Sequence, residues 1–451
     1  MTYLSTLKTK KIVVLGAGVT GYSCARFLQS NNLNFSINDS RENAIDIHEF
    51  RQNFPNADIS LGRWDQKLIA SATLIIVSPG IDLATAEISN NISAGCKVIG
   101  DVELYCLSEN TPILAVTGSN GKSTVVSLLA HVGSELGKSV TLGGNIGSPV
   151  LDILTEKRQK DVECLILELS SFQLESLHSM KAIAGTVLNL SDDHLDRHLS
   201  MENYAAIKQK IYSQSKVAIF NRGDKATFCS NHHTQISFGI DAPKEGDFGL
   251  ISDNGDVYLA YGHSKLINID KLPLAGLHNA LNYLAVLALG KSAGWSLSAM
   301  VEAIAGFKGL SHRCQKVETD DNVIWINDSK ATNVGATLAA IEGISATLGQ
   351  DKKLVLIAGG EGKGADFSPL EQPIYEHVGH LITLGKDGDK IAQLARNANR
   401  VKTIKEAVNT AKSFVEPGDV VLLSPACASI DMFANFAERG DMFVQALREA
   451  S

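Results

Sequence analysis

Long apolar runs are missing from this 451-residue chain, since no stretch approaches the roughly 20 consecutive apolar residues that cross a bilayer. The basic patch at residues 8–11 leads into an apolar run that glycines interrupt at once, so it predicts a strand rather than a signal peptide. The seven cysteines are scattered without C-x-x-C spacing, a pattern typical of a reducing compartment. We therefore expect a cytoplasmic protein without membrane insertion.

An excess of positive charge is also missing. The net charge is −8, which argues against a nucleic-acid partner while leaving room for local pockets that bind anionic small molecules. Hydrophobic residues make up 44% of the chain and charged residues 20%, which are globular values. The length favours about three domains.

One segment has the pattern of a phosphate-binding loop. The apolar run 113–116 leads into residues 117–124, TGSNGKST, and a helix-like run follows at 125–136. Loop amides and a helix N-terminus would face the anion, Lys122 would reach the phosphates, and the Ser123 hydroxyl would hold Mg²⁺. The general pattern G-x-x-x-x-G-K-[ST] requires its first glycine at position 116, where this chain has Val116. The loop is therefore a shortened version of the pattern. The alternative is an ordinary strand-to-helix turn.

Residues 1–102 carry a second glycine-rich turn. The apolar run 12–15 precedes GAGVTG at residues 16–21, and Asp39 ends the next run, where a dinucleotide-binding fold places a ribose-binding acid. This pattern favours either NAD or FAD binding or a doubly wound domain for another nucleotide-like ligand. A third run, 74–77, stops at Ser78-Pro79-Gly80, which we expect at the same edge of the sheet.

Residues 103–309 place further polar groups after predicted strands. Glu168 ends a buried run, the expected position of a magnesium ligand beside a phosphate loop, and His194 is flanked by acids at the end of another. Short alternating runs such as 256–261 indicate a hairpin or added strands. Asn279, at the start of an apolar helix, fits a helix cap or an amide that reads a base.

Residues 310–451 repeat this arrangement. Three apolar runs, 323–326, 354–358 and 420–423, each end in a polar or glycine-rich cluster. The carboxyl ends of parallel strands share one edge of a sheet, so these clusters predict the ligand edge of a third open α/β sheet.

Together, five segments resemble motifs of the Mur ligases of bacterial peptidoglycan synthesis, in the same order. They are GSNGKST at 118–124, ELSSFQ at 168–173, DH at 193–194, GLHNA at 276–280 and NDSKATN at 327–333. Three more, SPGI at 78–81, GGEGK at 359–363 and LSPACAS at 423–429, favour a member that adds D-glutamate to UDP-N-acetylmuramoyl-L-alanine.

The resemblance implies an α/β protein of three open domains, expected to be a monomer. A Rossmann-like domain, 1–102, would hold the UDP substrate. A P-loop ATPase-like domain, 103–309, would bind ATP, and a Rossmann-like domain, 310–451, would bring the amino acid. The substrate carboxylate would attack the γ-phosphate of ATP, and the D-glutamate amine would then attack the resulting acyl phosphate.

Roles for individual residues are implied by the same resemblance. A carboxylate that attacks ATP brings two anions together, so cations must neutralise their charges. The resemblance gives this role to Lys122, Arg313 and Lys330. Two Mg²⁺ ions are implied, one at Ser123 and Glu168 and the other at His194 and a CO2-derived carbamate on Lys208. The Tyr204-x-x-x-Lys spacing favours Lys208 over Lys210 as the carbamylated residue. The catalytic set would be Lys122, His194, Lys208, Arg313 and Lys330.

The resemblance also implies two sets of ligand-binding residues. The expected ATP-binding residues are Gly118, Ser119, Asn120, Gly121, Lys122, Ser123, Thr124, Asn279, Arg313 and Asp328. The expected substrate-binding residues are Val19, Thr20, Asp39, Ser40, Arg41, Ser78, Pro79, Gly80, Asn145, Thr332, Lys363, Ser429 and Phe436. No base for the amine is evident, and His312 is a weak candidate.

Three alternatives remain open at the level of the sequence. A related ligase would add another amino acid to a UDP-muramoyl peptide, or glutamate to folate. A nucleotide-sensing regulator would bind ATP or NAD without chemistry. An NAD dehydrogenase would leave the phosphate loop unexplained.

Overall fold

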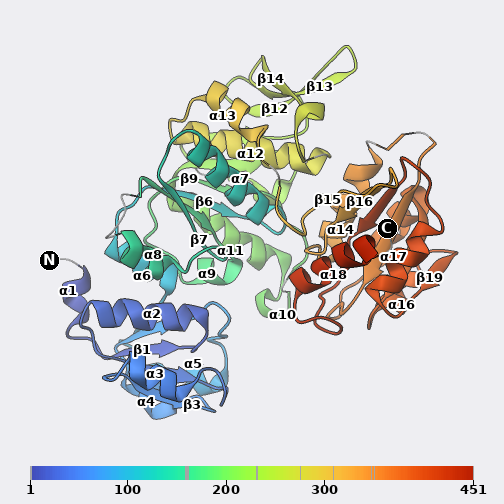
Figure 1. The fold of residues 1–451 in the computed structure, drawn as a ribbon. Coiled ribbons are helices and arrows are strands. Elements are labelled where there is room, and N and C mark those ends of the chain that lie inside the picture. Colours follow the sequence, from blue (N-terminus) through green and yellow to red (C-terminus); the bar gives the residue numbers. More distant parts are fainter. Residues whose placement is uncertain are drawn as a thin grey trace.

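The computed structural model describes residues 3–449 except 158–161, 194, 230–231, 275, 308, 347 and 350. Three sheets follow one another along the chain, each covered by helices, and they form three bodies coloured blue, green to yellow, and orange to red in Figure 1. The predicted fold class, three open α/β domains, is confirmed. Among the helices of the described residues, none is both long and apolar enough to cross a membrane.

The N-terminal sheet is parallel, with strand order β3-β2-β1-β4-β5. The central strand β1 is fully buried because helices cover both faces, as its uninterrupted apolar sequence predicts. The strands are β1 (Ile12–Leu15), β2 (Phe35–Asp39), β3 (Asp58–Leu61), β4 (Leu74–Val77) and β5 (Lys97–Gly100). The helices are α1 (Tyr3–Leu7), α2 (Val19–Ser30), α3 (Ile47–Asn53), α4 (Gln66–Ser71), α5 (Ala86–Ser89) and α6 (Asp101–Ser108).

The central sheet has the order β14-β13-β12-β11-β10-β9-β6-β8-β7. β12, β13 and β14 pair antiparallel at one edge, so the run 256–261, predicted as a hairpin or added strands, forms β13 of such a hairpin. The strands are β6 (Ile113–Thr117), β7 (Val140–Gly144), β8 (Cys164–Glu168), β9 (Ala182–Val187), β10 (Ser215–Asn221), β11 (Gln235–Phe238), β12 (Phe248–Asp253), β13 (Asp256–Tyr261) and β14 (Ser264–Asn268). The helices are α7 (Lys122–Glu135), α8 (Val150–Lys157), α9 (Ser171–Glu175), α10 (Leu195–His198), α11 (Met201–Ser213), α12 (Leu277–Ser292) and α13 (Leu297–Ile304), with short 3-10 helices η1 (Lys225–Thr227) and η2 (Ile269–Lys271).

The C-terminal sheet has the order β15-β16-β20-β17-β18-β19, and all its pairs are parallel except the edge pair β15–β16. The strands are β15 (Gln315–Val317), β16 (Ile324–Asn327), β17 (Leu354–Gly359), β18 (Val378–Leu384), β19 (Ala398–Arg400) and β20 (Val420–Leu423). The helices are η3 (Ser368–Leu370), α14 (Val334–Ser345), α15 (Glu371–His377), α16 (Gly388–Ala392), α17 (Ile404–Lys412) and α18 (Phe436–Glu449).

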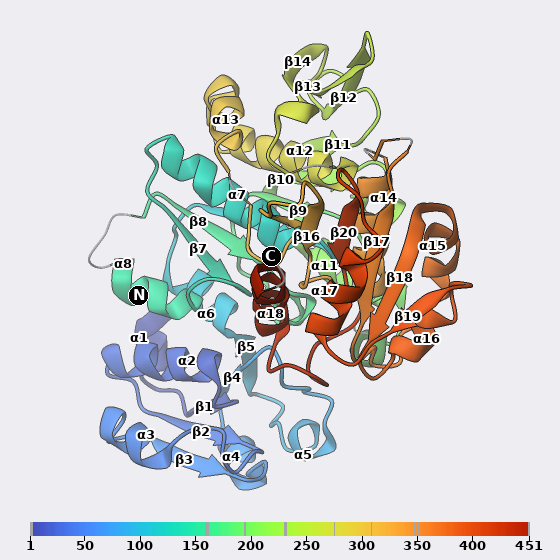
Figure 2. The ribbon, with the colours of Figure 1, turned by 45° about the vertical axis from the view of Figure 1, so that its right-hand side comes forward.

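Contacts between helices join the three bodies. α8 packs against α2 and α6, which links the N-terminal body to the central one. The predicted boundary at residue 102 falls inside α6. α14 of the C-terminal body packs against α12, and the two helices lie close together in Figure 2. Residues at or just after the carboxyl ends of β6, β8 and β9 line one cavity with residues of the C-terminal body.

Candidate active site

The phosphate loop joins β6 to α7, and Gly121 caps that helix with a φ of 83°. A side chain is excluded at Gly121, because a Cβ there would lie 2.6 Å from the Asn282 Oδ1 atom. The sequence predicted a helix from residue 125, but α7 begins at Lys122. Ser123 and Thr124 therefore lie in the first helical turn, where backbone amides are available to an anion.

Polar side chains from the segment after β9 and from α11 hold the loop in place. The Asn189 Oδ1 atom accepts from the Asn120 amide at 2.8 Å, and the Asn189 Nδ2 atom donates to the Asn120 carbonyl at 3.0 Å. The Ser119 hydroxyl lies 3.2 Å from the Tyr204 hydroxyl. These bonds fix the loop before any ligand binds.

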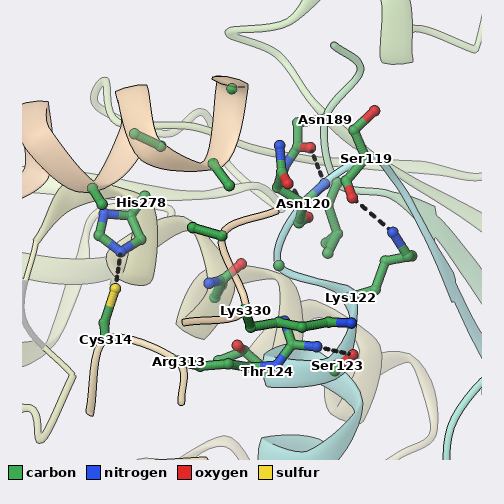
Figure 3. Close-up of a pocket in the computed structure, with 18 of the residues that line it drawn as sticks. Ser119, Asn120, Lys122, Ser123, Thr124, Asn189, His278, Arg313, Cys314 and Lys330 are labelled. Atoms are coloured by element: carbon green, nitrogen blue, oxygen red, sulfur yellow. Dashed lines mark hydrogen bonds between the residues drawn. The ribbon is translucent and has the colours of Figure 1, made fainter. Parts of the chain in front are cut away.

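Buried or partly buried cations surround the loop. The Lys122 Nζ atom donates to the Gly118 and Ser119 carbonyls, each at 2.7 Å, and the Lys208 Nζ atom donates to the Gly118 carbonyl at 3.0 Å. An Nη2 of Arg313, from the C-terminal body, donates to the Ser123 hydroxyl at 2.6 Å. In Figure 3, Arg313 and Lys330 lie side by side next to Ser123 and Thr124.

The pKa values of these groups reflect burial among like charges. Burial lowers the pKa of Lys122 and, together with the nearby Lys122 charge, lowers the pKa of Lys208 well below its ordinary value. Burial and the Arg313 charge lower the pKa of Lys330 to about 8. Burial also lowers the pKa of Arg313 itself. A polyanion bound here would relieve this repulsion, so the site is suited to phosphates.

A buried carboxylate lies at the end of β8. Glu168 is 1% exposed, and its Oε1 atom accepts from the Asn145 side chain at 2.8 Å. Its Oε2 atom has no hydrogen-bond partner within the described ranges. An unpaired carboxylate oxygen near the Ser123 hydroxyl fits an oxygen-preferring Mg²⁺ ion. His194, the other predicted metal ligand, lies outside the described residues. Across the rest of the described chain, no group of three or more His, Cys, Asp or Glu residues is arranged to hold a metal ion.

A cavity of about 750 Å³ opens between the central and C-terminal bodies, and most predicted ATP-binding residues line it. It brings together Ser119, Asn120, Gly121, Lys122, Ser123, Thr124, Asn145, Glu168, Asn279, Arg313, Asp328, Lys330, Thr332 and Phe436. Gly118 and Lys208 do not line the cavity, but they join each other next to its loop residues through the hydrogen bond described above. The structure thus groups residues from positions 119 to 436 of the chain around one space.

Two sets of predicted residues lie outside this cavity. Lys363 and Ser429 belong to the C-terminal body but do not line it, and Lys363 is exposed with a φ of 51°. The predicted UDP-binding residues of the N-terminal body form a separate group: Val19, Thr20, Asp39, Ser40, Arg41, Ser78, Pro79 and Gly80. His312 is buried, with its Nδ1 atom 3.1 Å from the Asn327 side chain, and does not line the cavity either.

Asp39 acts on the N-terminal glycine turn itself. Its Oδ2 atom accepts from the Ala17 amide at 2.8 Å and pairs with the Arg41 guanidinium at 2.8 Å. Burial alone would raise the pKa of Asp39, but the bonds from Arg41 and Ala17 outweigh burial and hold that pKa below its ordinary value.

Asn279 is not the cap of its helix. α12 begins at Leu277 with Gly276 as its N-cap, so Asn279 lies in the first turn and faces the cavity. The Asn282 side chain, one turn further on, donates to the Asn279 Oδ1 atom at 3.2 Å and also lines the cavity. The i, i+3 spacing of the two asparagines on one helix face could have indicated Asn282 from the sequence.

Two further residues organise the site without having been predicted. Asn189 lies at the end of a strand-like run, the same signal that marks Glu168 in the sequence. Arg439 is 1% exposed and donates to the carbonyls of Ser329 and Cys427, at 2.7 and 3.1 Å from its Nη2 atom. It thereby ties together two ligand-edge loops of the C-terminal sheet, and no local pattern in the sequence marks it.

Three profiles of one family match the sequence in order. Residues 10–100 match the Mur ligase MurD-like N-terminal domain, residues 116–290 the Mur ligase middle domain, and residues 312–427 the Mur ligase glutamate ligase domain. The chain belongs to the Mur ligase family.

Relatives with one activity resemble it over nearly their whole length. The UDP-N-acetylmuramoylalanine--D-glutamate ligase of Colwellia psychrerythraea is 54% identical, covering 99% of this chain and 98% of its own. The enzyme of the same name from Legionella pneumophila is 44% identical, covering 97% and 98%. The UDP-N-acetylmuramate-alanine ligase structure from Thermotoga maritima shares the fold, with a TM-score of 0.60, 18% identity and coverage of 98% and 100%.

Proposed function

We propose that this chain uses ATP to join D-glutamate to UDP-N-acetylmuramoyl-L-alanine in the synthesis of a peptidoglycan precursor. Its relatives named for that reaction are 42–54% identical over almost the whole chain. The observation that carries the chemistry is the phosphate loop, where cations from two bodies line one cavity with a buried carboxylate oxygen that has no partner among the residues the structure describes. Such a site lowers the barrier for an anion to attack a phosphate.

The reaction has two steps in this proposal. The L-alanyl carboxylate attacks the γ-phosphorus of ATP, so that an O–P bond forms, ADP leaves and an acyl phosphate results. The neutral amine of D-glutamate then attacks the acyl carbon, an amide forms, and inorganic phosphate leaves. Lys122, Arg313 and Lys330 neutralise the phosphate oxygens during both steps, since all three line the same cavity.

Other cavity residues would hold the nucleotide. The loop residues Gly118 to Thr124 would donate amides and hydroxyls to the phosphates. Asn279 and Asp328 would contact the base and ribose, because both line the cavity beyond the loop.

Glu168 and Ser123 would hold one Mg²⁺ ion, and the unpaired Glu168 oxygen fits this role. An ion held there would offset the negative charge of the phosphates. His194 and Lys208 would hold a second ion.

Lys208 fits the carbamate that this second site needs. CO2 adds only to a neutral amine, forming an N–C bond and releasing one proton, and burial beside Lys122 favours the neutral form of Lys208. Lys210 instead donates to the Glu175 carbonyl at 3.2 Å, away from the loop. The carbamate would turn a repelled cation into an oxygen ligand.

The substrates would span the three domains 1–102, 103–309 and 310–451. Asn145 would meet the muramoyl part of the UDP substrate. D-Glutamate would lie against the C-terminal domain, in this proposal on Thr332, Lys363, Ser429 and Phe436. The uridine diphosphate would lie on Val19, Thr20, Asp39, Ser40, Arg41, Ser78, Pro79 and Gly80. The enzyme would act as a monomer in the bacterial cytoplasm.

A coupled assay of ADP release tests the function. With UDP-N-acetylmuramoyl-L-alanine present, we expect ADP release that depends on D-glutamate and is absent with L-glutamate or meso-diaminopimelate. Faster release with another amino acid would assign the chain to a related ligase, and no release with any of them would refute the proposal.

A further inference from the structure

The loop that follows β4 in the N-terminal body, Ser78 to Asp82, packs on the glycine turn of the predicted UDP site. The Ser78 hydroxyl lies 3.5 Å from the Gly16 carbonyl, and a Cβ on Gly16 would lie 2.7 Å from the Ser78 Oγ atom. At the end of this loop, the Asp82 Oδ1 atom accepts from the Ala84 amide at 2.8 Å. The position of the Asp82 carboxylate therefore follows that of the glycine turn.

Arg197 reaches this carboxylate from the central body. Its Nη1 atom lies 2.7 Å from the Asp82 Oδ1 atom, and its Nη2 atom donates to the Glu175 Oε2 atom at 2.8 Å. The guanidinium also lies over the Phe172 ring, 5.8 Å from its centre, and the side chain is only 16% exposed. Arg197 is thus fixed on the central body and binds the N-terminal body with its remaining edge.

The chain around Arg197 leads directly to the reaction centre. Arg197 lies in the short helix α10, four residues after Asp193, which lines the central cavity. Glu175 ends α9, which follows the buried carboxylate Glu168 at the end of β8. One guanidinium therefore connects both strand-end segments of the central site to the substrate loop of the N-terminal body.

Close packing does not fix the two bodies at this point. A cavity of about 170 Å³ lies between them, lined by Ser78, Gln173 and Arg197 among others. The buried Asp101 carboxylate also lines it, and its Oδ1 atom has no partner among the residues that the structure describes. The Glu103 carboxylate on α6 also joins the two bodies, because it accepts from the His178 and Ser179 amides at 2.8 Å each. The Arg197–Asp82 ion pair differs from that contact in that it reaches the substrate loop itself.

We propose that Arg197 and Asp82 form an interdomain latch that sets the distance between the substrate loop and the reaction centre. This role rests on the proposed function, and it makes Arg197 a positioning residue for the UDP substrate. The latch holds the loop in the same place before and during the reaction. Loss of the latch therefore weakens binding of the UDP substrate equally in the ground state and in the transition state. This raises KM and leaves kcat nearly unchanged.

Asp82→Asn is the first test, because it is isosteric and Asp82 is half exposed. We expect KM for UDP-N-acetylmuramoyl-L-alanine to rise by about two- to fivefold, the effect of a partly exposed ion pair, with KM for ATP and for D-glutamate unchanged. Asp82→Glu should restore most of the affinity. An unchanged KM for the UDP substrate in Asp82→Asn would overturn the proposal.

A double-mutant cycle separates the latch from general damage. In an Arg197→Met background, Asp82→Asn should have no further effect on KM, because its partner is gone. If Arg197→Met does not fold, the comparison of Asp82→Asn with Asp82→Glu still tests the latch. Additive effects of the two substitutions would contradict the latch.

The same two bodies offer a matched control. Arg26 on α2 donates to Asp152 on α8, with 2.9 Å between Nε and Oδ1, and neither residue lines the described cavities. Asp152→Asn should leave all three KM values unchanged. Equal effects of Asp152→Asn and Asp82→Asn would assign the change to domain docking in general. A wild-type protein without ligase activity would instead refute the proposed function itself.

Discussion

The N-terminal glycine turn at residues 16–21 and the phosphate loop at residues 118–124 share one backbone arrangement but differ in the charges around them. In both, a buried parallel strand ends in glycines and a long helix begins. At the first turn, the buried carboxylate of Asp39 pairs with Arg41, whose side chain is 64% exposed. At the second, Lys208 is buried and Lys122 and Arg313 are partly buried, and burial lowers the pKa of all three. The backbone marks an anion site, whereas the neighbouring side chains decide whether it only binds or also reacts.

The largest expected effect is at the phosphate loop. Lys122→Ala should lower kcat by about 10²- to 10³-fold, the usual loss when one group that stabilises developing charge is removed. Thermal unfolding of the variant serves as the control for folding. A loss below tenfold in steady-state assays would mean that the two glycine sites differ less than their charges suggest.

The second expected effect concerns Lys208. Lys208→Ala should lower kcat by about 10- to 100-fold, as for the loss of a metal-site group. Lys210→Ala, two residues away, should retain normal activity. Removal of CO2 should reproduce part of the loss in the wild type only, and ¹³C-bicarbonate should give a carbamate NMR signal that Lys208→Ala lacks. Normal activity of Lys208→Ala would rule out the carbamate.

The third prediction addresses the N-terminal glycine turn, the proposed UDP-binding site. Asp39→Asn should raise KM for the UDP substrate by about tenfold, because it weakens the charged hydrogen bonds that shape the glycine turn. KM for ATP should stay unchanged. Asp46→Asn, which alters an exposed helix cap in the same domain, is the control. A fall in kcat without a change in KM would give this turn a catalytic role.

The smallest effect is a pH dependence. Lys330 has a pKa of about 8 in the free protein, so its charge is present below that pH and lost above it. The value of kcat/KM for ATP should therefore decline as pH rises through 8, with about half of the Lys330 contribution lost at pH 8. Lys330→Arg should remove this decline of kcat/KM above pH 8, because arginine keeps its charge. If the decline persists in Lys330→Arg, the titration of another group causes it.

Much of the fold could be predicted because short apolar runs ending in glycine or polar clusters are a local signal. Each of the predicted strands 12–15, 113–116 and 354–358 lies within a buried parallel strand. The start of α7 was placed three residues late, since Ser123 and Thr124 have low helix propensity but lie in its first turn.

Part of the candidate site could not be predicted, because it depends on distant contacts. Asn120 meets Asn189, Ser123 meets Arg313, and Asp82 meets Arg197 across more than 60 residues of chain. No periodicity encodes such pairs. The resemblance to a family supplied Arg313 and Lys208, whereas Arg197 and Arg439 emerged only from the folded arrangement.

Transfer of a labelled oxygen tests the central claim, that the phosphate loop activates a carboxylate, most directly. UDP-N-acetylmuramoyl-L-alanine labelled with ¹⁸O in its carboxylate should pass one ¹⁸O atom to inorganic phosphate for each amide formed, because that oxygen bridges carbon and phosphorus in the acyl phosphate. Amide formation with unlabelled phosphate would contradict the account.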